Sequence, residues 1–519
     1  MRSTPLQMIA LLPLTLILTR EKKVILEAPN YDNDCVLANI LAAHYLSSFD
    51  PVRARSYALA AESRLGKATL YEKAVFEAVS YLLSENMDDD VALELHSKLL
   101  KKFPKDLLSW KRVETLCSYM GRHDLSLPLF RKNEGQVYVN GMLAFCLIEL
   151  GHLREAEEAA RKGCEINEND SWAHHALCHV LQTECRFKEA VKFMEEHSDS
   201  WDSCSSLRFS HNWWHVAVCY LEGGSHISKV EEVYDHQMWK ELEKDDAVAR
   251  DVYTDALGLL LRLDTRGKLD DGFQDRLEKL ADSLTDKVSD ALVCPCAMWY
   301  QDWLFDITTI WALSKVEKTS LAHELLEGLK SRTSAMNPKK QKLMQKAILL
   351  AEAVYEYGKG NYEIALELLG LDFDAANYKV IGGSGLQMDV FNEIWYKLLL
   401  LNGKSSTGTL LKNTIISIYF GYIFVFSATN SAFTTPEPAA IEVLEKVTKQ
   451  RDGAPFLWRL LVSHLYDQTR QVDSYTSTVY ETLTFFWQEE SYSMEGKEKA
   501  GISAGKKAKA LESSYFKSA

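Results

Sequence analysis

The sequence of 519 residues predicts an all-α protein in which antiparallel helix pairs stack into an α-α superhelix. Strand patterns are sparse, proline is rare at 11 residues, and apolar residues recur at three- and four-residue spacing through most of the length. Apolar residues make up 47% of the chain, so it can bury a large core. Because a chain this long exceeds one compact core, it must form several domains or one extended repeat array.

The expected helices are separated by clusters of Gly, Asn or Asp. Three acidic residues, 88–90, precede one of them and suit a helix N-terminus, where carboxylates meet the positive end of the helix dipole. Calcium binding is the weaker interpretation of this cluster. The clearest helical segments are 34–47, 68–84, 91–102, 137–150, 153–165, 172–183 and 187–197.

An internal repeat connects two of these regions. Residues 137–170 superpose on residues 171–204 at the 34-residue period of the tetratricopeptide repeat. Leu143 then coincides with Leu177, Leu147 with Leu181, Leu153 with Phe187, and Glu155-Ala156 with Glu189-Ala190. No such helix pair can bury its apolar face alone, so neighbouring pairs must supply the partner surface. The repeat predicts a solenoid of the tetratricopeptide type.

The repeat extends in both directions along the chain. Trp110, Gly121 and Phe130 occupy the fourth, fifteenth and twenty-fourth places of the preceding unit, and residues 360–365 carry a weaker copy of the turn pattern. We therefore assign residues 24–407 to the solenoid. Residues 1–23 are an atypical N-terminus, which we interpret as disordered or as an error in the gene prediction.

Two later stretches interrupt the repeat. Removing residues 408–438, or residues 462–488, restores repeat spacing across each junction, so we interpret both as insertions with no repeat role, such as translated introns. A buried strand or a membrane helix is the other interpretation of the weakly charged stretch 408–438. Residues 439–461 then continue the solenoid, and residues 489–519 hold the remnant of the last helix pair and a tail. Transcript reads across the junctions would test this.

Composition and charge indicate the cellular compartment of the protein and argue against some kinds of partner. A net charge of −14 and the lack of a basic stripe argue against nucleic acid as a partner. The 10 cysteines are scattered singly, as in proteins of a reducing compartment, so we expect a cytoplasmic protein that does not bind membranes. The apolar run 8–18 is as long as the core of a secretory signal, but charged residues follow it where a cleavage site should lie.

Several motifs resemble those of the tetratricopeptide repeat protein 38 family. They lie at residues 24–29 (VILEAP), 34–44 (DCVLANILAAH), 171–181 (SWAHHALCHVL), 211–215 (HNWWH) and 391–395 (FNEIW). The resemblance covers about residues 21–407 and the two short pieces beyond the insertions. It implies a helical repeat fold and a cytosolic setting, and it provides no catalytic residue.

Histidines are concentrated in one region. Six of the 14 lie between residues 174 and 215. His175 and His179 are four residues apart and share a helix face, as do His211 and His215, about one repeat later. In a tetratricopeptide stack this face looks into the concave groove.

Three interpretations of the paired histidines stay open. They pack or form hydrogen bonds in an aromatic-rich region, they bind an organic or peptide ligand in the groove together with Trp172 and Trp214, or they chelate a transition metal.

The sequence favours a binding protein over an enzyme. No Walker loop, dinucleotide fingerprint or nucleophile elbow occurs, and the glycine-rich segment 382–385 has the pattern of a flexible loop. We expect a non-enzymatic protein without catalytic residues or a cofactor, which binds a protein or peptide partner in its concave groove. The alternative is a ligand- or metal-dependent enzyme or sensor centred on His175, His179, His211 and His215.

Overall fold

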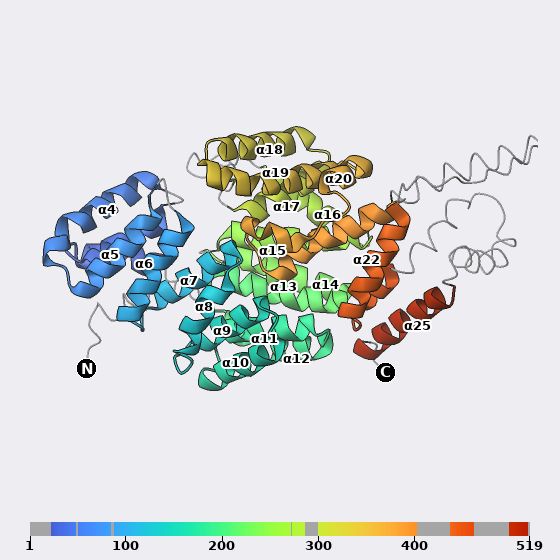
Figure 1. The fold of residues 1–519 in the computed structure, drawn as a ribbon, viewed down its shortest axis with the longest axis horizontal. Coiled ribbons are helices and arrows are strands. Elements are labelled where there is room, and N and C mark those ends of the chain that lie inside the picture. The colour runs from blue at the N-terminus through green and yellow to red at the C-terminus, as the bar shows by residue number, and fades with distance from the viewer. Residues whose placement is uncertain are drawn as a thin grey trace, which may run out of the picture.

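The computed structural model describes residues 22–47, 50–84, 88–245, 247–270, 272–285, 299–300, 302–401, 436–460 and 498–516. These residues form helices and connecting turns and contain no strand, which confirms the all-α prediction (Figure 1). The predicted atypical N-terminus up to residue 21, the suspected insertion 462–488, and the suspected insertion 408–438 apart from residues 436–438 lie outside the described residues.

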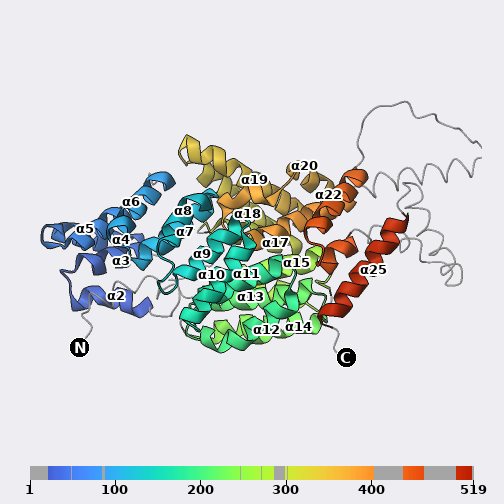
Figure 2. The ribbon, with the colours of Figure 1, turned by 60° about the horizontal axis from the view of Figure 1, so that its bottom comes forward.

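The N-terminal helices enclose a small core of their own, at the left of Figures 1 and 2. Thr69 and Glu72 form a capping box at the start of α5. Asp88 caps α6, as the acidic cluster 88–90 predicts, by accepting from the backbone N–H groups of Asp90 and Val91. The helices are α2 (Lys22–Tyr31), α3 (Val36–Leu46), α4 (Pro51–Arg64), α5 (Leu70–Leu82) and α6 (Asp89–Lys102).

The predicted repeats form helices in the central region, where the second core begins. Their boundaries agree with the expected segments to within a few residues. Leu143, Leu147, Leu177 and Leu181 are buried, and Leu153 is partly buried. Trp110 stacks on Phe130 at 5.2 Å between ring centroids, and Gly121 ends its helix in the left-handed conformation that glycine favours. The helices are α7 (Leu107–Met120), α8 (His123–Arg131), α9 (Val139–Glu149), α10 (Leu153–Ile166), α11 (Ser171–Thr183), α12 (Phe187–His197) and α13 (Ser206–Glu222).

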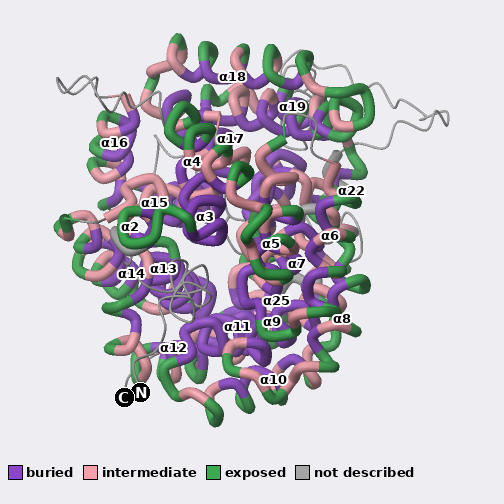
Figure 3. The backbone as a smooth tube through the Cα atoms, turned by 90° about the vertical axis from the view of Figure 1, so that its left-hand side faces the viewer, coloured by how far each residue is buried: buried purple, intermediate pink, exposed green. Residues whose placement is uncertain are grey.

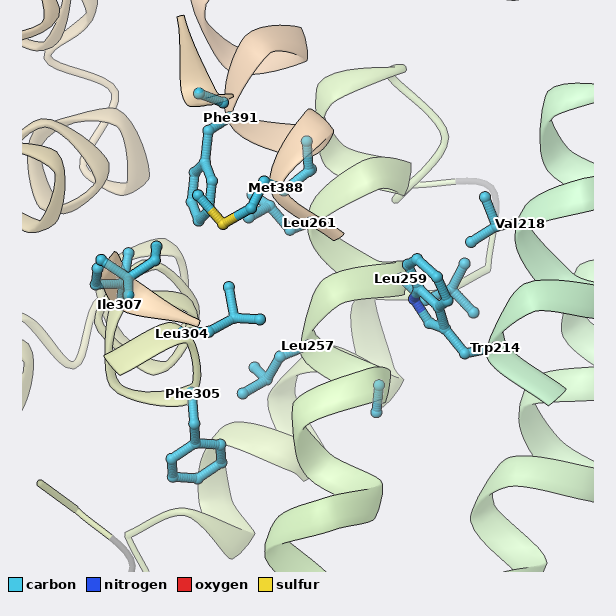
Figure 4. Packing of buried hydrophobic residues seen from close by; sticks show 14 of the residues in the cluster. Trp214, Val218, Leu257, Leu259, Leu261, Leu304, Phe305, Ile307, Met388 and Phe391 are labelled. Atoms are coloured by element: carbon cyan, nitrogen blue, oxygen red, sulfur yellow. The ribbon is translucent and has the colours of Figure 1, made fainter. Parts of the chain in front are cut away.

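Helix α15 lies at the centre of the molecule, with apolar side chains on two sides. On one side Leu259 meets Trp214 and Val218 of α13 (Figure 4). On the other, Leu257 and Leu261 face a second group: Leu304, Ile307, Met388 and Phe391 (Figure 4). The elements of this region are α14 (Ile227–Val233), η3 (Tyr234–Met238), η4 (Trp239–Glu243), α15 (Ala249–Thr265), α16 (Gln274–Ser283), α17 (Trp303–Lys315), α18 (Thr319–Ser334), α19 (Pro338–Gly358), α20 (Tyr362–Leu369), η6 (Ala375–Ile381) and a helix over 385–401.

The C-terminal helices pack back onto the central region (Figure 2). Tyr515 contacts Phe187 at 5.3 Å between ring centroids, and Phe516 contacts Tyr220 at 5.2 Å. Arg451, between α22 and the next helix, donates to Glu222 of α13 at 3.0 Å. The helices are α22 (Pro436–Gln450), a helix over 455–460, and α25 (Glu498–Tyr515).

Burial is strongest on the inner helices. Figure 3 shows α11 and α13 mostly buried, whereas α18 and α10 carry many exposed residues. Within the described part of the chain, no helix is both long and apolar enough to cross a membrane.

Candidate metal centre

The two histidine pairs lie on helices α11 and α13, which pack against each other. Each helix is capped at its N-terminus, α11 by Asp170 and α13 by Ser205. Because a helix turns once in 3.6 residues, the four-residue spacing holds both imidazoles of a pair on one face. The packing of α11 on α13 turns these two faces toward each other.

The four imidazoles form one compact cluster. One ligand atom from each of His175, His179, His211 and His215 lies within 4.8 Å of the other three. The Nε2 atoms of His175 and His179 are 3.0 Å apart, and the rings of His179 and His215 are 4.4 Å apart between centroids. A tetrahedral ion at its usual distance from imidazole nitrogen, 2.0–2.1 Å, holds its ligand nitrogens about 3.4 Å apart. Small side-chain adjustments would close the cluster around such an ion.

Neighbouring side chains orient two of the rings. His215 donates from Nδ1 to Oε1 of Gln182 at 3.0 Å, and His211 donates from Nδ1 to Asp255 at 2.8 Å. Asp255, on α15, is itself held by the hydroxyl of Ser210 at 2.7 Å. A proton held on Nδ1 leaves the Nε2 lone pair free, which is how histidine ligands of metals are commonly oriented.

The cluster is enclosed, whereas the repeat positions predict that its residues line a concave groove. The four histidines are between 0% and 8% exposed, and Trp172 and Trp214 are also buried. The Trp214 ring stacks on His211 at 5.2 Å, and Phe145 of α9 stacks on His175 at 5.8 Å. Aromatic side chains thus cover faces of the imidazole rings. From their repeat positions, these rings were expected to face the groove.

Burial also determines the charge of the rings. Removal from water lowers the pKa of His175, His179 and His215 well below the ordinary value for histidine. Neighbouring cations add to the effect, Arg208 on His175 among them. The rings are therefore neutral at physiological pH, as metal ligands must be.

One turn ahead of the histidines, a tryptophan ring lies between two cations. Arg208 lies 3.4 Å from the centroid of the Trp172 ring and Lys111 lies 3.5 Å from it, which places them on opposite faces. Burial lowers the pKa of Arg208 to about 10 and that of Lys111 to about 8. Lys111 is also paired with Glu114.

A cavity of about 150 Å³ lies beside the cluster. Phe145 lines this cavity and also contacts His175 and His179, so its ring separates the two spaces. Segment 382–384 is a loop and forms part of the cavity wall. The other lining side chains are Lys111, Glu114, Thr115, Ser118, His123, Glu149 and Lys379.

The structure brings together all six candidate residues of the sequence analysis. Reasoning from the sequence missed Arg208, Gln182, Asp255 and Phe145. One signal was present for Arg208: Trp172, His175 and His179 have the same three- and four-residue spacing on α11 as Arg208, His211 and His215 have on α13. Asp255 and Phe145 come from other helices and have no such signal.

No protein-family model matches the chain. The resemblance to the tetratricopeptide repeat protein 38 family therefore stays a prediction from its motifs. The fold and the site define the class of protein: an all-α chain with a buried cluster of four histidines that can hold a metal ion.

Proposed function

We propose that this chain binds one divalent first-row transition-metal ion through His175, His179, His211 and His215. The observation that carries the proposal is the convergence of four buried imidazoles, two of them oriented by Gln182 and Asp255. Four nitrogen donors suit zinc, copper, nickel, cobalt or iron, whereas calcium and magnesium prefer oxygen.

A purely structural role explains the cluster less well. Nε2 of His215 and Nδ1 of His175 are buried without a hydrogen-bond partner among the described residues. Buried polar atoms left without a partner cost about 1–3 kcal/mol each. A metal ion would occupy the lone pair of His215 and replace the 3.0 Å hydrogen bond between the Nε2 atoms of His175 and His179. The orphaned Nε2 of His215 favours a bound ion over simple packing.

We propose that the chain which forms this site folds as a tetratricopeptide-like solenoid, like that of the tetratricopeptide repeat protein 38 family. Helices α9, α11, α13 and α15 alternate along the chain with α10, α12 and α14, and within this first row each helix contacts the next. This is the contact pattern of stacked helix pairs. In such a stack the site draws on four successive inner helices, with α9 and α15 contributing Phe145 and Asp255.

The alternative of a peptide held by these residues has less support. Trp172, Trp214 and the four histidines are buried, so a peptide could reach them only by separating packed helices. A protein partner of this chain would bind elsewhere on its surface.

Metal analysis of the purified full chain tests the proposal. We expect one equivalent of metal after incubation with Zn²⁺ or Co²⁺ and dialysis, and its loss in His179→Ala and His215→Ala. His174→Ala is a matched control, because His174 is buried on the same helix but bonds Glu168 and Trp201 instead. Wild-type protein that retains no metal, or metal that survives both cluster variants, would overturn the proposal.

A further inference from the structure

Arg208 lies on the same side of α13 as the cluster. It precedes His211 by three residues and His215 by seven, so the three side chains share one helix face. Its charge acts on His175, His179 and His215. The guanidinium is therefore a close neighbour of the proposed metal.

Arg208 has donors without acceptors. The residue is 3% exposed, and its Nε and Nη1 atoms have no hydrogen-bond partner among the described residues. The Trp172 ring beneath the guanidinium accepts no conventional hydrogen bond. A buried arginine normally pairs with a carboxylate or phosphate, because its planar fork of N–H groups fits two oxygens.

The charges around the cluster favour an anion. With a divalent metal in place, its charge adds to those of Arg208, of Lys111 and of Arg262, which acts on His215. Three carboxylates act on Arg208: those of Glu114, Asp170 and Asp255. None of these carboxylates accepts a hydrogen bond from Nε or Nη1 of Arg208. Buried charge of this kind is costly unless it is paired.

We propose that the centre binds a small carboxylate as its anionic ligand, with one oxygen directed to the metal and the other accepting from Arg208. This inference rests on the proposed metal function. It assigns the ligand class to a monocarboxylic acid, because the two oxygens of one carboxylate are enough to serve both the metal and Arg208. First-row metals accept such a fifth ligand beside four nitrogens, as zinc does when it expands to five-coordination.

The neighbouring cavity provides space and a path for such a ligand. Its volume of about 150 Å³ equals that of about five water molecules in the liquid, enough for the body of a short-chain acid. Lys111 lines this cavity and also covers the face of Trp172 opposite Arg208. Rotation of the Phe145 ring would join the cavity to the cluster.

Cobalt spectroscopy of the full chain tests the inference. Acetate added to the Co²⁺-loaded protein should change the visible absorption bands of the ion, and Arg208→Gln should raise the acetate concentration required about 10- to 100-fold, as the loss of a charged hydrogen bond predicts. Cobalt content should stay at one equivalent in this variant. Arg208→Lys, which keeps the charge without the fork, should fall between the two.

Two controls separate the outcomes. Arg262→Gln removes another buried arginine, whose charge also acts on His215 but whose guanidinium donates to the backbone carbonyl of Leu386, so acetate binding should change far less. The melting temperature of the metal-free protein should not fall in Arg208→Gln, since an unpaired buried charge is removed; a fall would assign Arg208 a structural role and overturn the inference.

The remaining results are decisive in different ways. Failure of the wild-type protein to bind cobalt overturns the proposed function itself. Cobalt binding without an acetate response, or an unchanged response in Arg208→Gln, overturns only the carboxylate inference. Tighter binding of inorganic phosphate than of acetate would also overturn the assignment to a monocarboxylic acid.

Discussion

Two groups of buried histidines lie beside an arginine in this protein, and they differ in what the arginine does. In the N-terminal region, Arg112 donates to Nε2 of His44 and acts on the nearby His96. In the central region, Arg208 lies next to four histidines and donates to none of those rings through Nε or Nη1. In the first group, the arginine occupies an imidazole lone pair that a metal would need.

Both groups of histidines are buried, so burial alone does not identify a candidate metal centre. Both groups contain imidazoles whose pKa is lowered by removal from water, to about 3 for His44 and His96. The N-terminal pair satisfies one nitrogen each with protein partners, since His96 bonds Ser109 at 2.9 Å through Nδ1. In the central group His211 and His215 also bond protein partners through Nδ1, but one nitrogen of each of the four rings lies within 4.8 Å of the others. Convergence of lone pairs distinguishes a candidate ligand set from ordinary core histidines.

Metal removal should produce the largest difference between the central and the N-terminal histidine groups. A ligand that binds only the folded state at a thousand times its Kd stabilises that state by about 4 kcal/mol. We expect chelation to lower the free energy of unfolding of the wild type by about that amount. It should leave His179→Ala unaffected. Hydrogen exchange should locate the loss of protection in α11 and α13 and not in α3 or α6; equal loss in both regions would contradict a local centre.

Asp255→Asn should weaken metal binding without abolishing it. The amide keeps the shape of the carboxylate but loses the charge that orients His211. Loss of such a partner typically costs 10- to 100-fold in metal affinity. Competition with a chromophoric chelator measures this change. An unchanged affinity would show that Asp255 only packs against the ring.

Low pH should reduce the stability of the fold through the buried His96 of the N-terminal group. Burial, then Arg112 and His44, depress the pKa of His96 to about 3, below the ordinary value of 6.5. The unfolded chain therefore takes up a proton below pH 6.5 that the folded chain refuses until about pH 3, and stability is lost as the pH falls through this window.

Replacing this ring should flatten the acid response. His96→Asn should reduce the pH dependence of the unfolding free energy by up to about 1.4 kcal/mol per pH unit between pH 6 and 4. Urea unfolding at a series of pH values measures the slope, preferably on metal-free protein so that the central cluster does not contribute. Parallel curves for the two proteins would show that His96 protonates while folded.

The smallest expected effect concerns the capping box of α5. Thr69→Ala removes the acceptor for the backbone N–H of Glu72 and should cost about 1 kcal/mol. Thr69→Ser keeps the hydroxyl and serves as the control. Thr69 lies far along the chain from the histidine cluster, so metal affinity should not change in either variant. A change in metal affinity would show that the two regions are energetically coupled.

The sequence supported the prediction of helix positions to a useful degree. Repeat positions such as Leu143 and Leu177 are buried, and the expected helix over 187–197 has the bounds of α12. The histidine pairs were also evident, because four-residue spacing on a helix is a local property. The burial of these residues was not evident from the sequence, since it depends on how far neighbouring aromatic rings reach across the helices.

The sequence by itself determined which residues share a helix face, because the helical period is set by backbone geometry within a few residues. Thus His175 with His179, and His211 with His215, required no tertiary information. Only the tertiary structure decided that the two faces meet, that Asp255 bonds His211 from 44 residues away, and that Phe145 closes the cluster. Those contacts depend on side-chain packing between separate helices, which no local pattern encodes.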